Sequence, residues 1–153
     1  MREIEFRGYN RKTKSWYYGL LGQFNDKYFI DVGSGTKPFV DKESIGQYTG
    51  FKDSKGKKIY EGDVLQIVRN SEEYNFEVYY CEKMGIWGGY DEYVDEDKEL
   101  YKIVKDGDSE IINNIYNENL AFELYDFMCD SKQAIENMKN VAETMKKGAI
   151  KIC

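Results

Sequence analysis

The sequence predicts a mainly β protein that ends in one amphipathic helix. Aromatic residues make up 16% of the 153 residues, and 14 residues are Tyr, which packs well on pleated surfaces. Short apolar stretches recur up to residue 112 and are separated by Gly, Asn and Asp turn signals. After residue 130, apolar residues instead recur every three or four positions, as in a helix. The length suits one ordinary domain with a real core.

The strands can be justified in chain order. Ile4 and Phe6 alternate with charged residues, which predicts a strand at residues 2–7. Further strands are expected at 16–24, 27–32, 47–51, 58–60, 64–68, 74–80, 86–90, 100–104 and 110–112. Asp106-Gly107 is a hairpin turn signal before the last of these. The strand and turn spacing within residues 47–68 matches a small barrel or sandwich. Residues 118–128 fit either a helix or a strand.

The tail has a helical pattern. Asp130 or Ser131 can cap a helix over 131–147, and Gly148 can end it. One apolar stripe runs along this helix and contains Ile135, Met138, Val141, Ala142 and Met145. We therefore expect a β domain at 1–128 and a helical appendage at 129–153. The stripe would pack against the β domain or against a second copy of the chain, as a homodimer.

Composition narrows the function classes. The chain has no His, so the commonest general base and metal ligand is missing, and we predict a protein that is not an enzyme. Its 3 Cys are far apart and form no CxxC, so neither a disulfide framework nor a zinc site is predicted. We expect no cofactor. No apolar run is long enough to span a membrane, and the charged N-terminus does not resemble a signal peptide, so a cytoplasmic protein is expected.

Charge is unevenly distributed along the chain. Residues 70–130 hold 4 Lys/Arg and 17 Asp/Glu, whereas residues 1–69 hold 13 and 9. The densest acidic segment is 91–99, with the carboxylates Asp91, Glu92, Asp95, Glu96, Asp97 and Glu99. This segment fits three alternatives: a solvated loop, a divalent-cation site through Asp95, Asp97 and Glu99, or a surface that docks on a basic host protein.

A basic segment offers a different site. Lys55, Lys57 and Lys58 lie on the predicted hairpin 52–58, where they would meet phosphates. Trp16 and Tyr48 would then stack on bases, as aromatic residues do in other small barrels. The simpler interpretation is a solvated hairpin tip, with the aromatic residues packed in or near the core. Likewise, the carboxylates at 106, 108 and 110 suggest either a turn or a carboxylate enzyme.

One long stretch is recognisable. QYTGFKDSKGKKIYEGDV, residues 47–64, closely resembles the signature of the YopX-like family of small bacteriophage and prophage proteins. MREIEFR at 1–7 and INNIYNE at 112–118 resemble the start and the closing motif of that family. The chain departs from the family pattern at Tyr9-Asn10, where Trp-Asp is usual, and at Asn113-Asn114, where Gly-Asn is usual. The resemblance implies an SH3-like β-barrel and a phage origin, and it supplies no catalytic residue.

Together these observations predict a phage accessory protein in the cytoplasm of a bacterial host. We expect it to bind a host protein that has a basic surface, for example as an acidic nucleic-acid mimic that inhibits a host defence nuclease, like an anti-CRISPR protein. The alternatives are a nucleic-acid-binding SH3-like module that uses hairpin 52–58, and a carboxylate- or metal-dependent enzyme.

Overall fold

The computed structural model describes residues 1–92 and 96–117, except for the side chain of Glu96. The chain divides into two compact units, Met1–Tyr116 and Asn117–Cys153, and the elements that follow belong to the first. The predicted helix at 131–147, the ambiguous stretch 118–128 and the expected boundary after residue 128 lie outside the described residues. Within the described residues, no helix has the length and apolar character needed to cross a membrane.

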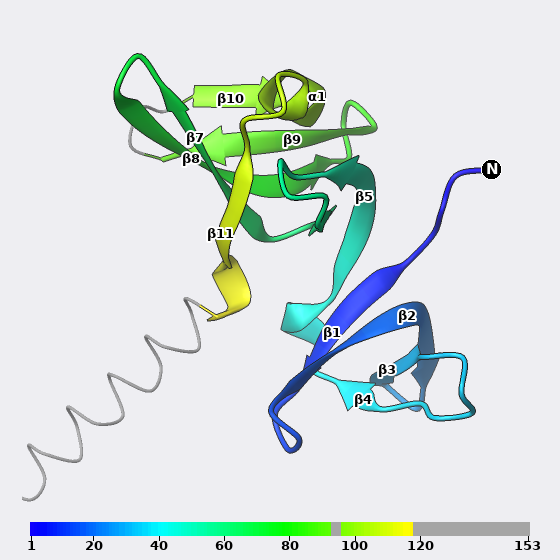
Figure 1. The fold of residues 1–153 in the computed structure, drawn as a ribbon. Helices are drawn as coiled ribbons and strands as arrows, with labels where there is room; N and C mark the ends of the chain where they lie inside the picture. The colour runs from blue at the N-terminus through cyan, green and yellow to red at the C-terminus, as the bar shows by residue number, and fades with distance from the viewer. Residues whose placement is uncertain (93–95, 118–153) are drawn as a thin grey trace, which may run out of the picture. The chain divides into compact units, whose positions relative to one another are not determined.

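The first half of the unit forms an antiparallel sheet. Its strands are β1 (Phe6–Asn10), β2 (Ser15–Phe24), β3 (Lys27–Asp31), β4 (Phe39–Val40), β5 (Gly46–Lys52) and β6 (Lys58–Tyr60). They are ordered β4-β3-β2-β1-β5-β6, and the short 3-10 helix η1 (Lys42–Ser44) precedes β5. The start of β5 pairs with β1 and its later part pairs with β6. This strand therefore extends from a first lobe, formed by β1 to β4, to the lobe that contains the later strands (Figure 1).

Strands β1 to β4 curl around a small core. Ile30 and Val40 are buried there. The Asp41 N–H donates to the Tyr9 carbonyl at 2.9 Å, which brings the end of β4 back to β1. Gly8 makes this approach possible, because a Cβ at that position would lie 2.6 Å from a Val40 methyl group. A side chain at residue 8 would therefore push the two strands apart.

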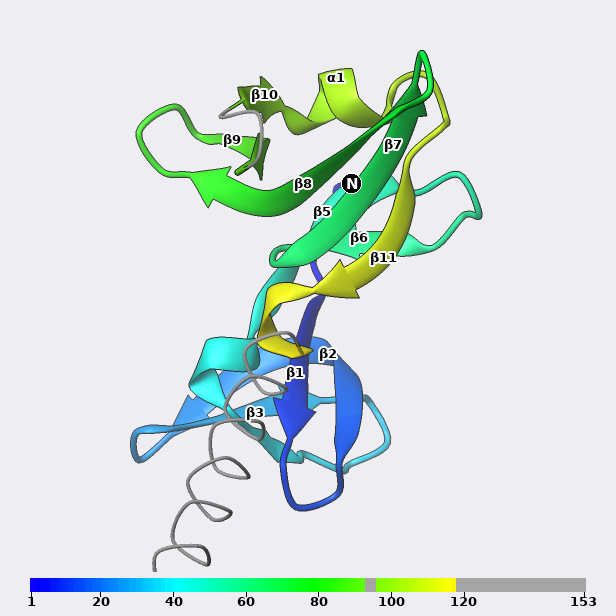
Figure 2. The ribbon, with the colours of Figure 1, turned by 90° about the vertical axis from the view of Figure 1, so that its left-hand side faces the viewer.

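The second half forms another antiparallel sheet (Figure 2). Its strands are β7 (Asp63–Arg69), β8 (Glu72–Cys81), β9 (Ile86–Asp91), β10 (Glu96–Glu99) and β11 (Glu110–Asn114), in the order β10-β9-β8-β7-β11. A five-residue helix, α1 (Leu100–Val104), joins β10 to the turn before β11. Apolar residues alternate with polar ones along β8, which gives this sheet an inner and an outer face.

The main core lies against the inner face of this second sheet. It contains Ile59 of β6, residues of β7 and β8, and two residues of α1, namely Leu65, Ile67, Phe76, Val78, Leu100 and Ile103. Gly89 of β9 provides the space for α1, because a Cβ there would lie 2.4 Å from the Ile103 side chain and 3.1 Å from Phe76. The hairpin β5–β6 and α1 thus cover the same inner face.

The prediction of a mainly β fold is confirmed, and most expected strands are present. The strand expected at 100–104 was wrong, because these residues form α1 and bury Leu100 and Ile103 three positions apart, on one side of a helical turn. Asp106-Gly107 accordingly joins α1 to β11 and not two strands of a hairpin. The described strands form two sheets, and they do not close into a barrel. The SH3-like barrel is therefore not confirmed and stays a prediction.

Candidate protein-binding face

Asp63, in the most patterned stretch of the sequence, joins the two sheets. One of its carboxylate oxygens accepts a hydrogen bond from Arg7 Nη1, and the other accepts the Tyr60 N–H at 2.8 Å. Arg7 Nη2 donates to the Glu61 carbonyl at 3.0 Å. The guanidinium carbon also lies 4.9 Å from the centroid of Trp16. Because Arg7 belongs to β1 and Asp63 to β7, this buried pair links the first sheet to the second.

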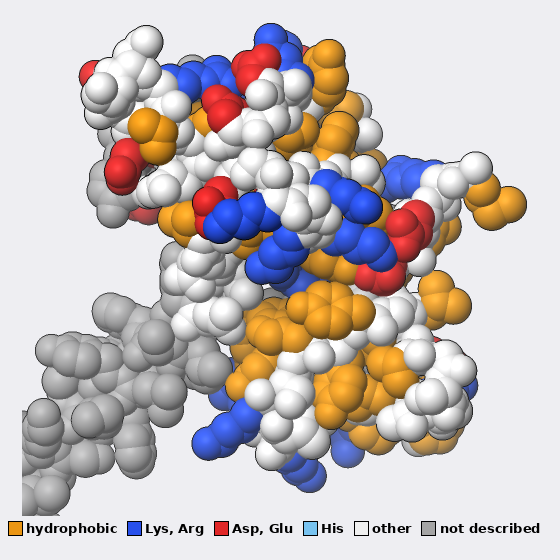
Figure 3. Space-filling model, in the orientation of Figure 1, with side chains coloured by type: hydrophobic (Ala, Val, Ile, Leu, Met, Phe, Trp, Pro, Cys, Tyr) orange, Lys and Arg blue, Asp and Glu red, His pale blue; other side chains and the backbone are white. Residues whose placement is uncertain are grey.

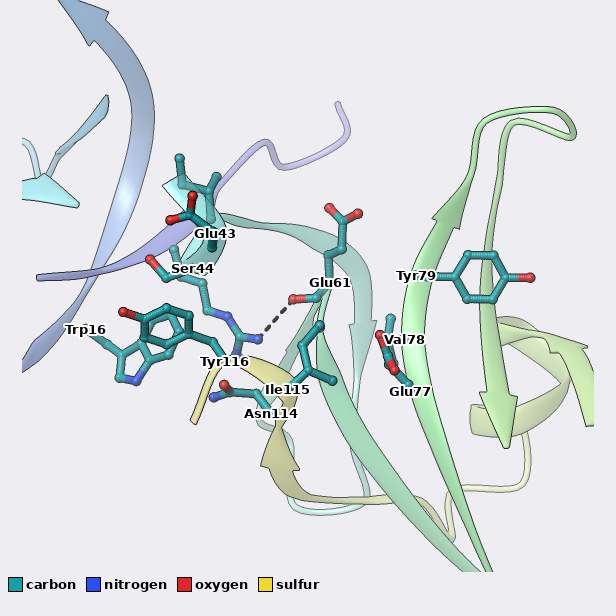
Figure 4. A pocket seen from close by; sticks show the side chains of 13 residues that line it. Trp16, Glu43, Ser44, Glu61, Glu77, Val78, Tyr79, Asn114, Ile115 and Tyr116 are labelled. Atoms are coloured by element: carbon teal, nitrogen blue, oxygen red, sulfur yellow. Dashed lines mark hydrogen bonds between the residues drawn. The ribbon is translucent and has the colours of Figure 1, made fainter. Parts of the chain in front are cut away.

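A cleft of about 220 Å³ lies beside this pair (Figure 4). Glu43, Glu61 and Glu77 line it together with Asn114 and Tyr116. Burial raises the pKa of Glu61. Backbone hydrogen bonds and the positive charge of Arg7 act in the opposite direction but do not cancel this rise. The cleft presents carboxylates beside a guanidinium that is already paired. Ser44 also lines it, but the Ser44 hydroxyl accepts the Tyr9 N–H and donates to the Asp41 carbonyl, so it is not placed as an activated nucleophile. The role of Arg7 and Asp63 in this arrangement is structural.

Asp53 fixes the tip of hairpin β5–β6. Its Oδ1 accepts the N–H groups of Lys55 and Lys57 at 2.9 and 2.8 Å, and its Oδ2 accepts the N–H of Ile111 at 3.3 Å. Gly56 has φ +79°, the left-handed conformation that the turn requires. The polar residues of this stretch therefore shape the turn and attach it to β11.

The lysines of the hairpin are largely engaged. Lys58 Nζ lies between Glu3 and Glu5, at 2.6 and 2.9 Å, and these hydrogen bonds raise its pKa. Lys55 pairs with Glu110, which raises its pKa as well. Lys57 is exposed. Two of the three lysines expected to meet phosphates are therefore neutralised by carboxylates.

The aromatic residues of that alternative site are not available for stacking. Tyr48 is only 4% exposed, and its ring packs against Tyr60. Trp16 is half-buried between Arg7 and the rings of Tyr9 and Tyr116. The structure does not bring the three lysines, Trp16 and Tyr48 together as one open surface.

The acidic segment is divided by the fold. Asp91 is 2% exposed, and its carboxylate accepts the Asn75 N–H at 2.9 Å, so its assignment as a surface contact was wrong. Glu92 is exposed, as are Asp97 and Glu99 on β10. Asp95 and the side chain of Glu96 lie outside the described residues. In the part of the chain that is described, no three His, Cys, Asp or Glu residues are arranged to hold a metal ion.

The outer face of the second sheet gathers carboxylates from two strands. Glu77 of β8 lies opposite Tyr90 of β9, which in turn lies opposite Asp97 of β10. Directly opposed residues share a face, and so do residues two apart on one strand. We define the acidic face by the side chains that this register places together: Glu73, Glu77, Tyr79, Asp97 and Glu99.

Tyr79 connects β8 to β10 across the acidic face. Its hydroxyl donates to Asp97 Oδ1 at 2.7 Å, and this hydrogen bond, with burial, raises the pKa of Tyr79 to about 12. The Tyr79 ring can cross β9 because residue 88 is Gly: a Cβ there would lie 2.8 Å from a ring carbon. A groove of about 230 Å³ runs beside the ring, with Met84 and Ile86 among its lining residues.

The family assignment follows from a comparison with family models. The model described as YopX protein matches residues 5–121. The chain belongs to the YopX family. A search of curated proteins found no match. This match confirms the resemblance found in the sequence. The matched region includes both the Arg7–Asp63 pair and the acidic face.

Sequence reasoning on this YopX-family chain missed Glu73, Glu77 and Tyr79. A signal for them was present, because residues 73, 75, 77 and 79 alternate with the apolar residues 74, 76 and 78. That alternation places Glu73, Glu77 and Tyr79 on the solvent side of a strand. Their proximity to Asp97 depends on the pairing of β8, β9 and β10, which the alternation does not specify.

The hydrogen bond to Asp97 leads to a testable pKa. Replacing Asp97 with Asn should lower the pKa of Tyr79 from about 12 towards 10, the ordinary value for Tyr, because the hydroxyl loses a charged acceptor. A raised pKa favours the neutral phenol in the folded state, so its stabilising effect is present below pH 10 and is lost as the pH rises towards 12. NMR of ¹³C-labelled tyrosine rings measures this titration. Glu99→Gln is the control, and an unchanged Tyr79 pKa in Asp97→Asn would refute the assigned cause.

Proposed function

We propose that this chain is a non-enzymatic phage accessory protein that binds a basic surface of a host protein through its acidic face. The observation that supports the proposal best is the register of β8, β9 and β10. It brings Glu77 and Asp97 onto one face with an exposed Tyr90, although they are far apart in sequence. Carboxylates grouped with tyrosines are suited to attract and then contact a positively charged protein surface.

The groove on the acidic face suggests how a partner is held. A long cationic side chain fits its chemistry, because Met84 and Ile86 provide apolar contacts for the methylene stem. Asp97 and Glu99, which also line the groove, would meet the guanidinium or ammonium head. Lys102 now pairs with Glu99 at 2.9 Å, and an incoming Arg would displace it from this exposed position at little cost.

A more specific form of the proposal is inhibition of a host defence nuclease in the cytoplasm of the bacterial host. Such nucleases hold phosphates in clefts lined by Lys and Arg. An acidic face would occupy the same cleft in competition with the nucleic acid, in the manner of an anti-CRISPR protein. The phage origin is the implication of the resemblance between residues 47–64 and the signature of the YopX-like family.

Affinity capture tests the proposal. Tagged protein is incubated with lysate of a bacterial host, with and without nuclease treatment, and captured proteins are quantified by mass spectrometry. We expect a stoichiometric partner that survives nuclease treatment, and Asp97→Lys/Glu99→Lys should weaken its binding about tenfold or more, because each reversal places like charges in contact. Raising the salt concentration should weaken the complex as well.

A matched control separates this face from net charge. Glu43→Lys/Glu72→Lys makes the same change in net charge at two exposed positions outside the acidic face, one in η1 and the other at the start of β8. This variant should keep the partner. Equal loss in both double variants, or capture that neither salt nor Asp97→Lys/Glu99→Lys affects, would contradict the assignment of the acidic face.

A further inference from the structure

The outer surface of the first sheet exposes large apolar side chains. Leu20 is 59% exposed, Phe24 is 64% exposed and Phe39 is 48% exposed. Phe29 lies opposite Phe39 and Gly22, so these residues share one face of β2, β3 and β4. Figure 3 shows hydrophobic side chains gathered over the lobe of β1 to β4, below a band of Lys and Arg. We call the surface of Leu20, Phe24, Phe29 and Phe39 the aromatic face.

Lysines accompany the rings of the aromatic face. Lys27 Nζ lies 5.8 Å from the centroid of Phe39, and Lys37 Nζ lies 5.5 Å from that of Phe29. Asp31 shares the face and is paired with Lys37 at 3.2 Å. Residues 6–46 hold 7 Lys/Arg and 4 Asp/Glu, in contrast to the acidic second sheet. The aromatic face is thus apolar at its centre and mildly positive at its rim.

The Phe29 side chain is half-buried. It lies across the backbone of Gly22, where a Cβ would be only 2.2 Å from a ring carbon. The Phe39 ring stands nearly perpendicular to it, with centroids 6.4 Å apart and an interplanar angle of 89°. Because Phe has no polar atom to satisfy, these positions supply only π-faces and edges to a ligand.

We propose that the aromatic face binds single-stranded nucleic acid, with unpaired bases stacked on Phe24, Phe29 and Phe39. Lys27 would lie beside the sugar-phosphate backbone of the stacked bases, whereas Lys37 is already paired with Asp31. Rings on a sheet surface with lysines at the rim are the combination that binds single strands without strong sequence preference, because every base has a π-face. A duplex, whose bases are already stacked on one another, cannot use these rings.

Charge favours this occupant over a second copy of the chain. Two aromatic faces packed together would bring the lysines at their rims close to one another, and like charges in a buried interface are unfavourable. A polyanion instead neutralises the rim and covers the rings in the same step. This surface is separate from the acidic face, so the two proposals can fail independently.

Fluorescence anisotropy of a labelled oligo(dT) of 12 nucleotides with the full chain tests the inference. We expect saturable binding, with weaker binding of a duplex of the same length, and oligo(rU) in place of oligo(dT) tests RNA. Phe24→Ala/Phe39→Ala should weaken binding at least about tenfold, because two stacking contacts are lost. Lys27→Gln should reduce the slope of log K against log salt by about 0.7, the effect of one phosphate contact on a single strand.

Val68→Ala/Tyr101→Ala is the matched control, since both side chains are exposed and belong to the second half of the unit. It should bind oligo(dT) like the wild type, and thermal melts should show that both double variants are folded. Absence of binding, or equal weakening in the control variant, would overturn the inference. So would a change in assembly size in Phe24→Ala/Phe39→Ala with unchanged oligo(dT) binding, because the aromatic face would then be a contact between copies.

Discussion

Replacing Asp63 with alanine should lower the free energy of unfolding by about 3–5 kcal/mol, a large part of the stability of a domain of this size. The variant leaves the guanidinium of Arg7, which is 7% exposed, without its carboxylate. It also leaves the Tyr60 N–H without its acceptor. Because Arg7 and Asp63 lie in different sheets, the contact between the sheets weakens as well. Urea denaturation followed by circular dichroism measures the loss.

Two further variants test this explanation. Arg7→Met/Asp63→Leu removes both charges and should recover part of the lost stability, because no unpaired charge remains buried. Arg69→Ala breaks an exposed pair with Asp106 and should cost no more than about 1 kcal/mol. If Asp63→Ala proved as mild as Arg69→Ala, the pair would not be the link between the sheets that we describe.

Replacing Phe76 with alanine should cost about 3–5 kcal/mol, through lost burial and the cavity that remains. Phe76 is fully buried on the inner face of β8, close to Gly89, and α1 packs against the same core. The backbone of β9 and the packed side chain of Ile103 keep the walls of that cavity apart. The core therefore cannot readily collapse into it. The urea concentration at the midpoint of unfolding should therefore fall sharply.

Val68→Ala is the control for this prediction. Val68 lies on β7, in the same sheet, but 56% of it is exposed, so its truncation should change stability by no more than about 0.5 kcal/mol. Comparable losses in Phe76→Ala and Val68→Ala would mean that the inner face of the sheet is not the main core. Hydrogen exchange provides a second measurement, since amides of β7 and β8 should lose protection in Phe76→Ala.

Local patterns were sufficient to predict most strands and turns, because alternation and turn chemistry act over a few residues. Asp53 and Gly56 are an example, since their turn depends on nearby N–H groups and on one positive φ. Residues 100–104 show where such patterns fail. LYKIV is rich in residues that favour strands, and it becomes helical where Gly89, on another strand, makes room for Ile103.

The candidate site was less predictable for the same reason. Within the segment 91–99 all carboxylates look alike, yet Asp91 points into the protein and Asp97 points out of it. The difference comes from the pairing of β9 with β8 and β10, which joins residues far apart in sequence. Glu77 was missed because only that pairing makes it a neighbour of Asp97.

The Arg7–Asp63 link also affects how the chain is made on the ribosome. Strands β1 to β4 pair with near neighbours, so they can assemble soon after they emerge. Arg7, however, must wait for a carboxylate that is synthesised 56 residues later. Until then Arg7 lacks its carboxylate partner, although its side chain is buried in the finished protein. The first lobe can therefore form its lasting contact with the second sheet only after Asp63 has emerged from the ribosome.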